Sequence, residues 1–112
     1  DGSNIRDWIY VEDHVDALIK IMKNGNPGEK YCIGANNQLT NKKIIQIICS
    51  KLDQKIPKKN SYSKLVQNVT DRIGHDYRYA IDIAKIKNEL GWEPKTNIDK
   101  GLRNTLNWYL ND

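Results

Sequence analysis

Segments with strand character alternate with amphipathic helical segments in the first half of this chain. The stretch "RDWIYV", residues 6–11, is rich in aromatic and β-branched residues and predicts a short strand. Residues 12–25 follow with apolar side chains at helical spacing and end at a glycine, and "EKYCIG", residues 29–34, predicts a second strand. Thr40 and Asn41 are suitable caps for a second apolar helical stripe over residues 41–53. The order strand, helix, strand, helix favours an α/β fold.

The second half adds two more helices. Residues 63–69 alternate weakly and predict an extended segment, and "YRYAID", residues 77–82, predicts a strand that ends at a helix cap, Asp82. A helix over residues 83–90 stops at Gly91, and Thr96 with Asp99 resembles a capping box for a last helix. We therefore expect one domain over residues 1–112, of α/β class with some α+β character, containing about four helices and three or four short strands.

Composition limits the classes to which the chain can belong. It has 112 residues and a mass of 13.0 kDa, with 38% hydrophobic and 29% charged residues, which is typical of a globular domain with a modest core. No apolar run approaches the roughly 20 residues that a membrane span needs, and the start of the chain does not resemble a signal peptide. We expect a cytoplasmic protein without a membrane partner.

The basic residues and the cysteines do not point to a special site. The net charge is +4, but the lysines are scattered, and the densest run, residues 55–60, has no aromatic side chain for base stacking. We interpret that run as a solvated loop and expect no nucleic-acid partner. Cys32 and Cys49 lie in apolar stretches without a C-x-x-C motif, which predicts two buried free thiols.

The densest polar cluster of the chain lies in "TDRIGHD", residues 70–76. Arg72 offers a planar fork that matches phosphate, Asp71 can orient it, Gly74 allows close approach of the backbone, and His75 adds a donor. This set suits an anionic ligand. A surface turn in which Asp71 and Arg72 pair with neighbouring residues is the competing interpretation.

The sequence disfavours two other kinds of site, a metal site and a nucleophilic catalytic site. A metal site would need adjacent residues, His75 and the aspartates beside it, to converge on one ion, and we predict none. Nucleophilic catalysis is also disfavoured, because neither cysteine neighbours a histidine and the serines at 61 and 63 lie in no strand-turn-helix elbow. We expect no catalytic residue in this chain.

Three stretches, "DGSNIRDWIYVEDHVDALIKIMKNGNPGEKYCIG", "DRIGHDYRYAID" and "KIKNELGWEPKTNIDKGLRNTLNWYL", together resemble the carboxyl-terminal third of the dTDP-glucose 4,6-dehydratase family. That family consists of extended short-chain dehydrogenases/reductases. The resemblance implies a substrate-binding domain that follows an amino-terminal Rossmann domain, absent from this sequence, in which NAD is bound. It also implies a homodimeric lyase that acts on dTDP-glucose or a related nucleotide sugar in deoxysugar biosynthesis, such as that of rhamnose for cell-wall polysaccharide.

The resemblance also assigns residues to the substrate pocket. Arg6, Asn41, Asp71, Arg72, Gly74 and His75 match positions that line the nucleotide and pyrophosphate part of that pocket in the family. Three positions depart from the family pattern, because Ile73 replaces a usual proline, Tyr77 a usual arginine and Cys32 a usual asparagine. None of these departures touches the two arginines or the histidine.

The residues that carry the reaction in the family are missing from this chain. The seven glycines fit no dinucleotide fingerprint, and no tyrosine is followed by a lysine four positions later, as the family's base requires. We therefore expect this chain to be the nucleotide-sugar binding part of an enzyme whose catalytic and NAD-binding residues lie in a domain absent from this sequence. The substrate domain of a UDP-sugar epimerase or decarboxylase, and a non-catalytic binding module, remain the alternatives.

Overall fold

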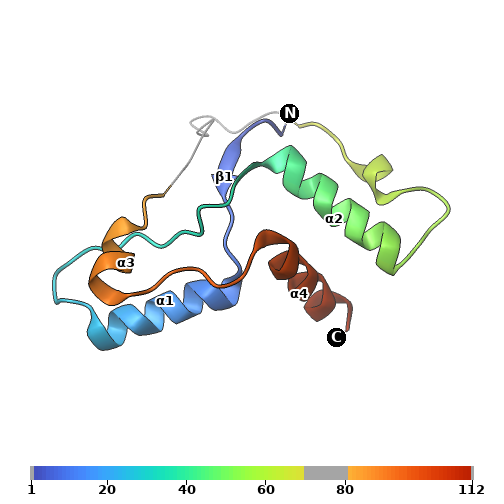
Figure 1. The fold of residues 1–112 in the computed structure, drawn as a ribbon. Helices are drawn as coiled ribbons and strands as arrows, with labels where there is room; N and C mark the ends of the chain where they lie inside the picture. The colour runs from blue at the N-terminus through green and yellow to red at the C-terminus, as the bar shows by residue number, and fades with distance from the viewer. Residues whose placement is uncertain (1, 70–80, 112) are drawn as a thin grey trace. The chain divides into compact units, whose positions relative to one another are not determined.

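The computed structural model describes residues 2–69 and 81–111, which contain helices and short strands (Figure 1). The elements are β1 (Ile5–Asp7), α1 (Val11–Asn24), β2 (Gln38–Thr40), α2 (Asn41–Lys55), the 3-10 helix η1 (Tyr62–Leu65), α3 (Ala84–Leu90) and α4 (Ile98–Leu110). The chain divides into two compact units, Asp1–Arg6 with Leu39–Tyr79 as unit 1 and Asp7–Gln38 with Ala80–Asp112 as unit 2. The four α-helices and the strand pair agree with the predicted mixture of helix and strand.

The two strands β1 and β2 pair with each other. The backbone N–H of Asn41 donates to the carbonyl of Asn4 over 2.9 Å, and that of Trp8 donates to the carbonyl of Asn37 over 3.1 Å. Partner numbers fall along one strand as they rise along the other, so the pair is antiparallel. The prediction of a strand over residues 6–11 is wrong beyond Asp7, because the helix α1 already begins at Val11.

The predicted strand at residues 29–34 is not formed. Tyr31 and Ile33 pack against the core of unit 2 instead, and the carbonyl of Lys30 accepts a hydrogen bond from the ammonium of Lys85 over 2.8 Å. A strand requires a neighbouring backbone to share its ladder, and in the described part of the chain the sheet consists of β1 and β2. Strand-like composition alone was therefore misleading here.

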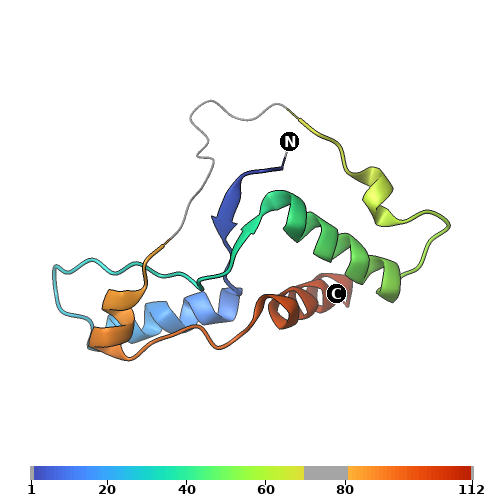
Figure 2. The ribbon, with the colours of Figure 1, turned by 45° about the horizontal axis from the view of Figure 1, so that its top comes forward.

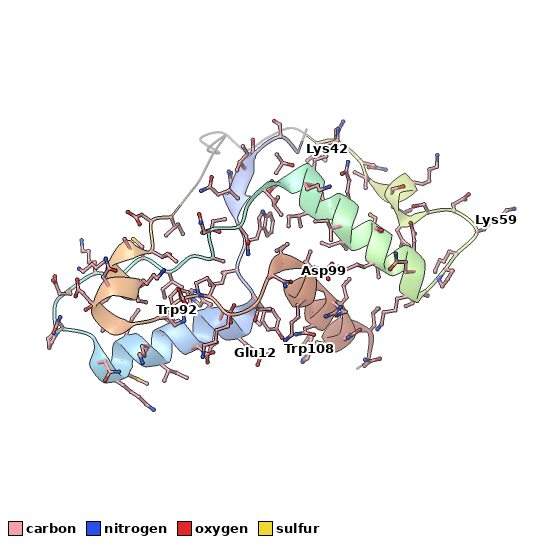
Figure 3. The ribbon with its side chains drawn as sticks, viewed as in Figure 1. Glu12, Lys42, Lys59, Trp92, Asp99 and Trp108 are labelled. Atoms are coloured by element: carbon pink, nitrogen blue, oxygen red, sulfur yellow. The ribbon has the colours of Figure 1, made fainter. Side chains whose placement is uncertain are left out.

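The core of unit 2 joins α1 to α3 and to the corner that follows α3. Its buried residues are Ala17, Ile86, Leu90 and Trp92, and Ala17 and Ile86 have no exposed surface. Figures 1 and 2 both show α1 and α3 side by side, and Figure 3 shows Trp92 next to them. Gly91 ends α3 in a left-handed conformation (φ 71°) that is favourable for glycine, and this turn directs Trp92 into the core. The predicted stop at Gly91 is confirmed.

The apolar stripe of α1 does not face this core. Val15, Leu18 and Met22 are 43%, 49% and 78% exposed, whereas Asp13 and Ala17 are the buried residues of the helix. The spacing of the stripe was sufficient to predict the helix but not the side that packs in this structure. None of the helices in the described ranges combines the length and apolar character that crossing a bilayer requires.

A buried carboxylate fixes the start of α4. Asp13 is 4% exposed and accepts hydrogen bonds from the backbone N–H groups of Lys95 and Thr96, at 3.2 and 2.9 Å, and from the Thr96 hydroxyl. The predicted capping box at Thr96 is therefore wrong, because that hydroxyl is turned to Asp13. The cap of α4 is Asn97, whose side-chain oxygen accepts from the N–H of Lys100 over 2.8 Å.

Unit 1 is organised by α2. Thr40 caps the helix as predicted, with its hydroxyl accepting from the N–H of Lys43 over 3.0 Å, and Ile44 and Cys49 are buried. The expected exposed loop is formed by residues 56–60, whereas Lys55 still belongs to α2. Residues 62–65 form η1, so the prediction of an extended segment over 63–69 is wrong in its first part. The prediction of two buried thiols holds for Cys49 and is wrong for Cys32, which is exposed.

The loop after α2 is tied back to the helix by Asp53. Its carboxylate accepts from the Ser61 hydroxyl over 2.6 Å and from the N–H of Tyr62 over 2.9 Å. The hydrogen bond from Ser61, and after it that from Tyr62, lower the pKa of Asp53 from its ordinary value of 3.8. The stabilisation is present above that ordinary value and is lost as the pH falls through the lowered pKa.

An NMR titration of the Asp53 carboxyl group is expected to show a midpoint below 3.8. Ser61→Ala removes the strongest contact, so the midpoint is expected to rise toward the ordinary value. Ser50→Ala, at an exposed serine of the same helix, serves as the control and leaves the midpoint unchanged. A midpoint that did not move in Ser61→Ala would contradict this assignment.

Candidate functional site

Arg6 lies in the middle of β1 and is half-buried. Its guanidinium donates to the carbonyl of Ile5 over 2.8 Å through Nη1, which holds the head group close to its own strand. A guanidinium has five donors, so this bond, which lies within the described residues, occupies only one of the donors that could bind a planar anion. The residue predicted from the resemblance therefore has the chemistry to bind a phosphate.

Asn41 is the first residue of α2, directly after β2. The N–H groups of Asn41 and Lys42 donate to the carbonyls of Asn4 and Gly2, at 2.9 and 2.8 Å, and that of Lys43 donates to the cap, Thr40. The start of a helix binds anions through backbone N–H groups only when these groups are free. Here they have intramolecular partners, so unit 1 would contact an anion at this point through side chains.

The strand register brings Arg6 and Asn41 to the same region of unit 1. Since residue 41 bonds to residue 4, Arg6 lies opposite Leu39, two residues before Asn41. The remaining predicted site residues, Asp71, Arg72, Gly74 and His75, lie outside the described residues, as do Ile73 and Tyr77. Their role in the site therefore stays a prediction.

Asp7, the residue after Arg6, has contacts that the sequence reasoning missed. Its carboxylate accepts from three consecutive backbone N–H groups, those of Ala35 (3.1 Å), Asn36 (3.3 Å) and Asn37 (2.8 Å). Asn36 has a left-handed backbone (φ 58°), which helps successive N–H groups to converge on one anion. The only available signal was an acidic residue directly beside the candidate arginine.

Unit 2 has a cavity of about 700 Å³ between the start of α1 and α4. Its walls carry the aromatic residues Trp8, Tyr10, Trp108 and Tyr109 together with the amides of Asn37, Asn97 and Asn104. Figure 3 labels two of the lining residues, Glu12 of α1 and Trp108 of α4. The sequence analysis did not single out this cavity, because its lining comes from segments far apart in the chain.

One titratable pair lies at this cavity. The Tyr10 hydroxyl donates to the Glu12 carboxylate over 2.6 Å, and this hydrogen bond is the main cause that raises the pKa of Tyr10 above its ordinary value of 10.0. A tyrosine with a raised pKa stays protonated at neutral pH and is a poor base. This hydrogen bond therefore does not favour Tyr10 as a base at neutral pH.

The residues of the described part do not fit a dinucleotide or a metal ion. Gly25 and Gly91 follow the ends of helices and Gly101 lies inside α4, whereas a dinucleotide fingerprint needs glycines that open a helix. Within residues 2–69 and 81–111, no group of three histidine, cysteine or acidic side chains is placed to hold a metal ion.

Comparison with known proteins shows the class to which this fold and strand pair belong. The chain belongs to the GDP-mannose 4,6 dehydratase family, whose model matches residues 1–105. It is 50% identical over 109 residues to a probable dTDP-glucose 4,6-dehydratase of Sinorhizobium fredii, and 48% identical over 109 residues to the dTDP-glucose 4,6-dehydratase of Shigella flexneri. Each alignment covers 97% of this chain but only 31% and 30% of the relative, so the chain spans about a third of the length of these relatives.

Solved structures agree with the sequence relatives. The dTDP-glucose 4,6-dehydratase of Bacillus anthracis, solved in complex with NAD, is 41% identical and superimposes with a TM-score of 0.86 over the whole chain and 33% of its own. The corresponding Streptomyces venezuelae enzyme gives a TM-score of 0.88 at 35% identity, again over 33% of its length. The resemblance to a carboxyl-terminal portion of these dehydratases is thereby confirmed.

Proposed function

We propose that this chain is the nucleotide-sugar binding part of an NAD-dependent dTDP-glucose 4,6-dehydratase. The observation that carries the proposal is the 50% identity over 97% of the chain to a relative of that name, of which the chain covers 31%. The full-length protein converts dTDP-glucose to dTDP-4-keto-6-deoxyglucose, in the cytoplasm, on the way to deoxysugars such as rhamnose. As a homodimer it carries this part once in each subunit.

The role of this chain in that enzyme is recognition of the diphosphate. Arg6 and Arg72 bind the pyrophosphate oxygens, and a guanidinium fork suits such a group because two parallel N–H donors match two oxygens. Asn41, Asp71, Gly74 and His75 complete the pocket. Binding energy from these remote contacts holds the sugar in the reactive geometry, which lowers the barrier at carbons that the chain does not touch.

NAD and the catalytic residues belong to the remaining two thirds of the protein, which contains the Rossmann domain. NAD bound there would supply reversible hydride transfer to and from the sugar. This chain has neither a glycine fingerprint nor a tyrosine followed by lysine at the required spacing. Its residues therefore bind and orient the substrate.

A second candidate function has a specific observation in its favour. A UDP-glucose 4-epimerase of Thermotoga maritima, solved with UDP-glucose, superimposes with a TM-score of 0.78 at 29% identity. The chain thus has the fold of a substrate part that serves another reaction on a UDP-sugar. The identity is below the 35% to 50% found for the dehydratases, and we therefore rank the epimerase second.

Calorimetric titration of the full-length protein with dTDP and with UDP distinguishes these candidates. We expect dTDP to bind more tightly than UDP, because the dehydratase acts on a dTDP-sugar. A preference for UDP would favour the epimerase, and failure of both diphosphates to bind would overturn the proposed role in nucleotide-sugar recognition.

A further inference from the structure

The end of β1 is held against the turn at residues 34–37 by Asp7. The three N–H groups of residues 35–37 donate to its two carboxylate oxygens, with Ala35 and Asn36 on Oδ2 and Asn37 on Oδ1. Trp8 adds two bonds, since its N–H donates to the carbonyl of Asn37 and its carbonyl accepts from the Asn37 side chain over 3.3 Å. All of these contacts lie within unit 2.

The turn is shaped to receive this carboxylate. Gly34 is buried, and a Cβ atom at that position would collide with Oδ2 of Asp7 and lie 3.1 Å from the Cβ of Ile81. The left-handed backbone of Asn36 is the other local requirement. The turn therefore binds the Asp7 carboxylate specifically, through its charge and through the close approach of the backbone at Gly34 to Oδ2.

The contact between Asp7 and the turn lies where it can determine the register of β1 against β2. β2 begins at Gln38, directly after the turn, and Arg6 directly precedes Asp7 in β1. A slip of one residue between paired strands turns every side chain to the opposite face. Each of these strands is only three residues long. Because Asp7 holds the turn at one end of the pair, the strands cannot slip by one residue.

We propose that Asp7 is a positioning residue for nucleotide-sugar binding, which fixes the register of β1 against β2 and thereby the face on which Arg6 is presented. The inference rests on the proposed function, because it needs Arg6 to bind the diphosphate. Asp7 itself does not touch the ligand. Its effect on binding passes through Arg6.

The test compares Asp7→Asn with Asp13→Asn in the full-length protein. Both aspartates accept hydrogen bonds from several backbone N–H groups within unit 2. Asparagine has one accepting oxygen and one donating NH2 group, so each variant places a donor against a backbone N–H group that needs an acceptor. Asp7→Asn is expected to weaken dTDP binding by roughly tenfold and to raise KM for dTDP-glucose with little change in kcat. Asp13→Asn is expected to lower the melting temperature without that loss of affinity.

A double-mutant cycle shows whether the effect passes through Arg6. In an Arg6→Ala background, Asp7→Asn should leave dTDP affinity nearly unchanged, because the side chain that it positions is gone. Gly34→Ala, which displaces the carboxylate without removing its charge, is the second variant if Asp7→Asn does not fold, and it should weaken dTDP binding in the same Arg6-dependent way. An equal loss of affinity with and without Arg6, or an equal loss in Asp13→Asn, would overturn the inference while leaving the proposed function intact. Absence of dTDP binding in the wild type would overturn both.

Discussion

Replacement of Arg72 by alanine in the full-length protein is expected to cost about 2–4 kcal/mol in kcat/KM for dTDP-glucose. The reason is that a desolvated phosphate then lacks a charged, bidentate partner. Arg72→Lys should cost less than alanine but still weaken binding, since an ammonium keeps the charge and loses the fork. His75→Ala should have a smaller effect than Arg72→Ala. Arg72 and His75 lie outside the residues that the structure describes, so these measurements are the test of their predicted role in binding the diphosphate.

The affinity of dTDP alone distinguishes a pyrophosphate contact from a surface ion pair. If Asp71 and Arg72 only form a surface turn, the loss should stay below about 1 kcal/mol. Lys59→Ala, in the exposed loop seen in Figure 3, removes one positive charge elsewhere and is the control for general electrostatic attraction. Equal dTDP affinities of wild type and Arg72→Ala would mean that Arg72 does not bind the diphosphate.

Ile86→Ala is expected to destabilise the full-length protein by about 2–5 kcal/mol, because it leaves a cavity in the core of unit 2. Ile86 has no exposed surface and packs in a cluster with Ala17, Leu90 and Trp92, so the neighbouring side chains have little freedom to fill the space. Denaturant unfolding measures the change, and Ile86→Val, which removes a single methyl group, should cost only about 0.5–1.5 kcal/mol. Similar costs for the two variants would show that Ile86 is not part of a close-packed core.

Helix ends were the features that could be read most reliably from the sequence. Thr40 as a cap and the glycines at 25 and 91 as stops were identified correctly, because each acts through hydrogen bonds to residues three or four positions away. Asp82 and Thr96 show the limit. Asp82 was predicted to cap α3, but the cap position is Ile83. Thr96 was predicted to cap α4. Its hydroxyl bonds to Asp13, which is 83 positions away in sequence, and the neighbouring Asn97 takes its place as the cap.

Strands were predicted less well, since a strand depends on a partner that composition does not reveal. Residues 29–34 have the composition of a strand, yet Tyr31 and Ile33 pack as part of a core cluster, and β2 forms from Gln38–Thr40, which composition did not mark. The apolar stripe of α1 shows the same difficulty. Its period predicts a helix, but the neighbour that covers each face cannot be derived from the period alone.

The candidate site was predicted chiefly through family resemblance. Arg6 and Asn41 have no local pattern that marks them, and the structure places both in unit 1, near the paired strands. Asp7 was missed for a physical reason. Its role depends on three backbone N–H groups about 30 positions away, and the left-handed conformation of Asn36 that makes them converge is not visible in the sequence.

The most direct test of the central claim is the mass of the product that the full-length protein makes from dTDP-glucose. A 4,6-dehydratase yields a nucleotide sugar that is lighter than its substrate by one molecule of water, whereas an epimerase yields a product of unchanged mass. The account predicts the lighter product, formed with NAD present and in much lower yield by the Arg72→Ala variant. A product of unchanged mass, or no conversion of dTDP-glucose by folded protein with NAD, would contradict it.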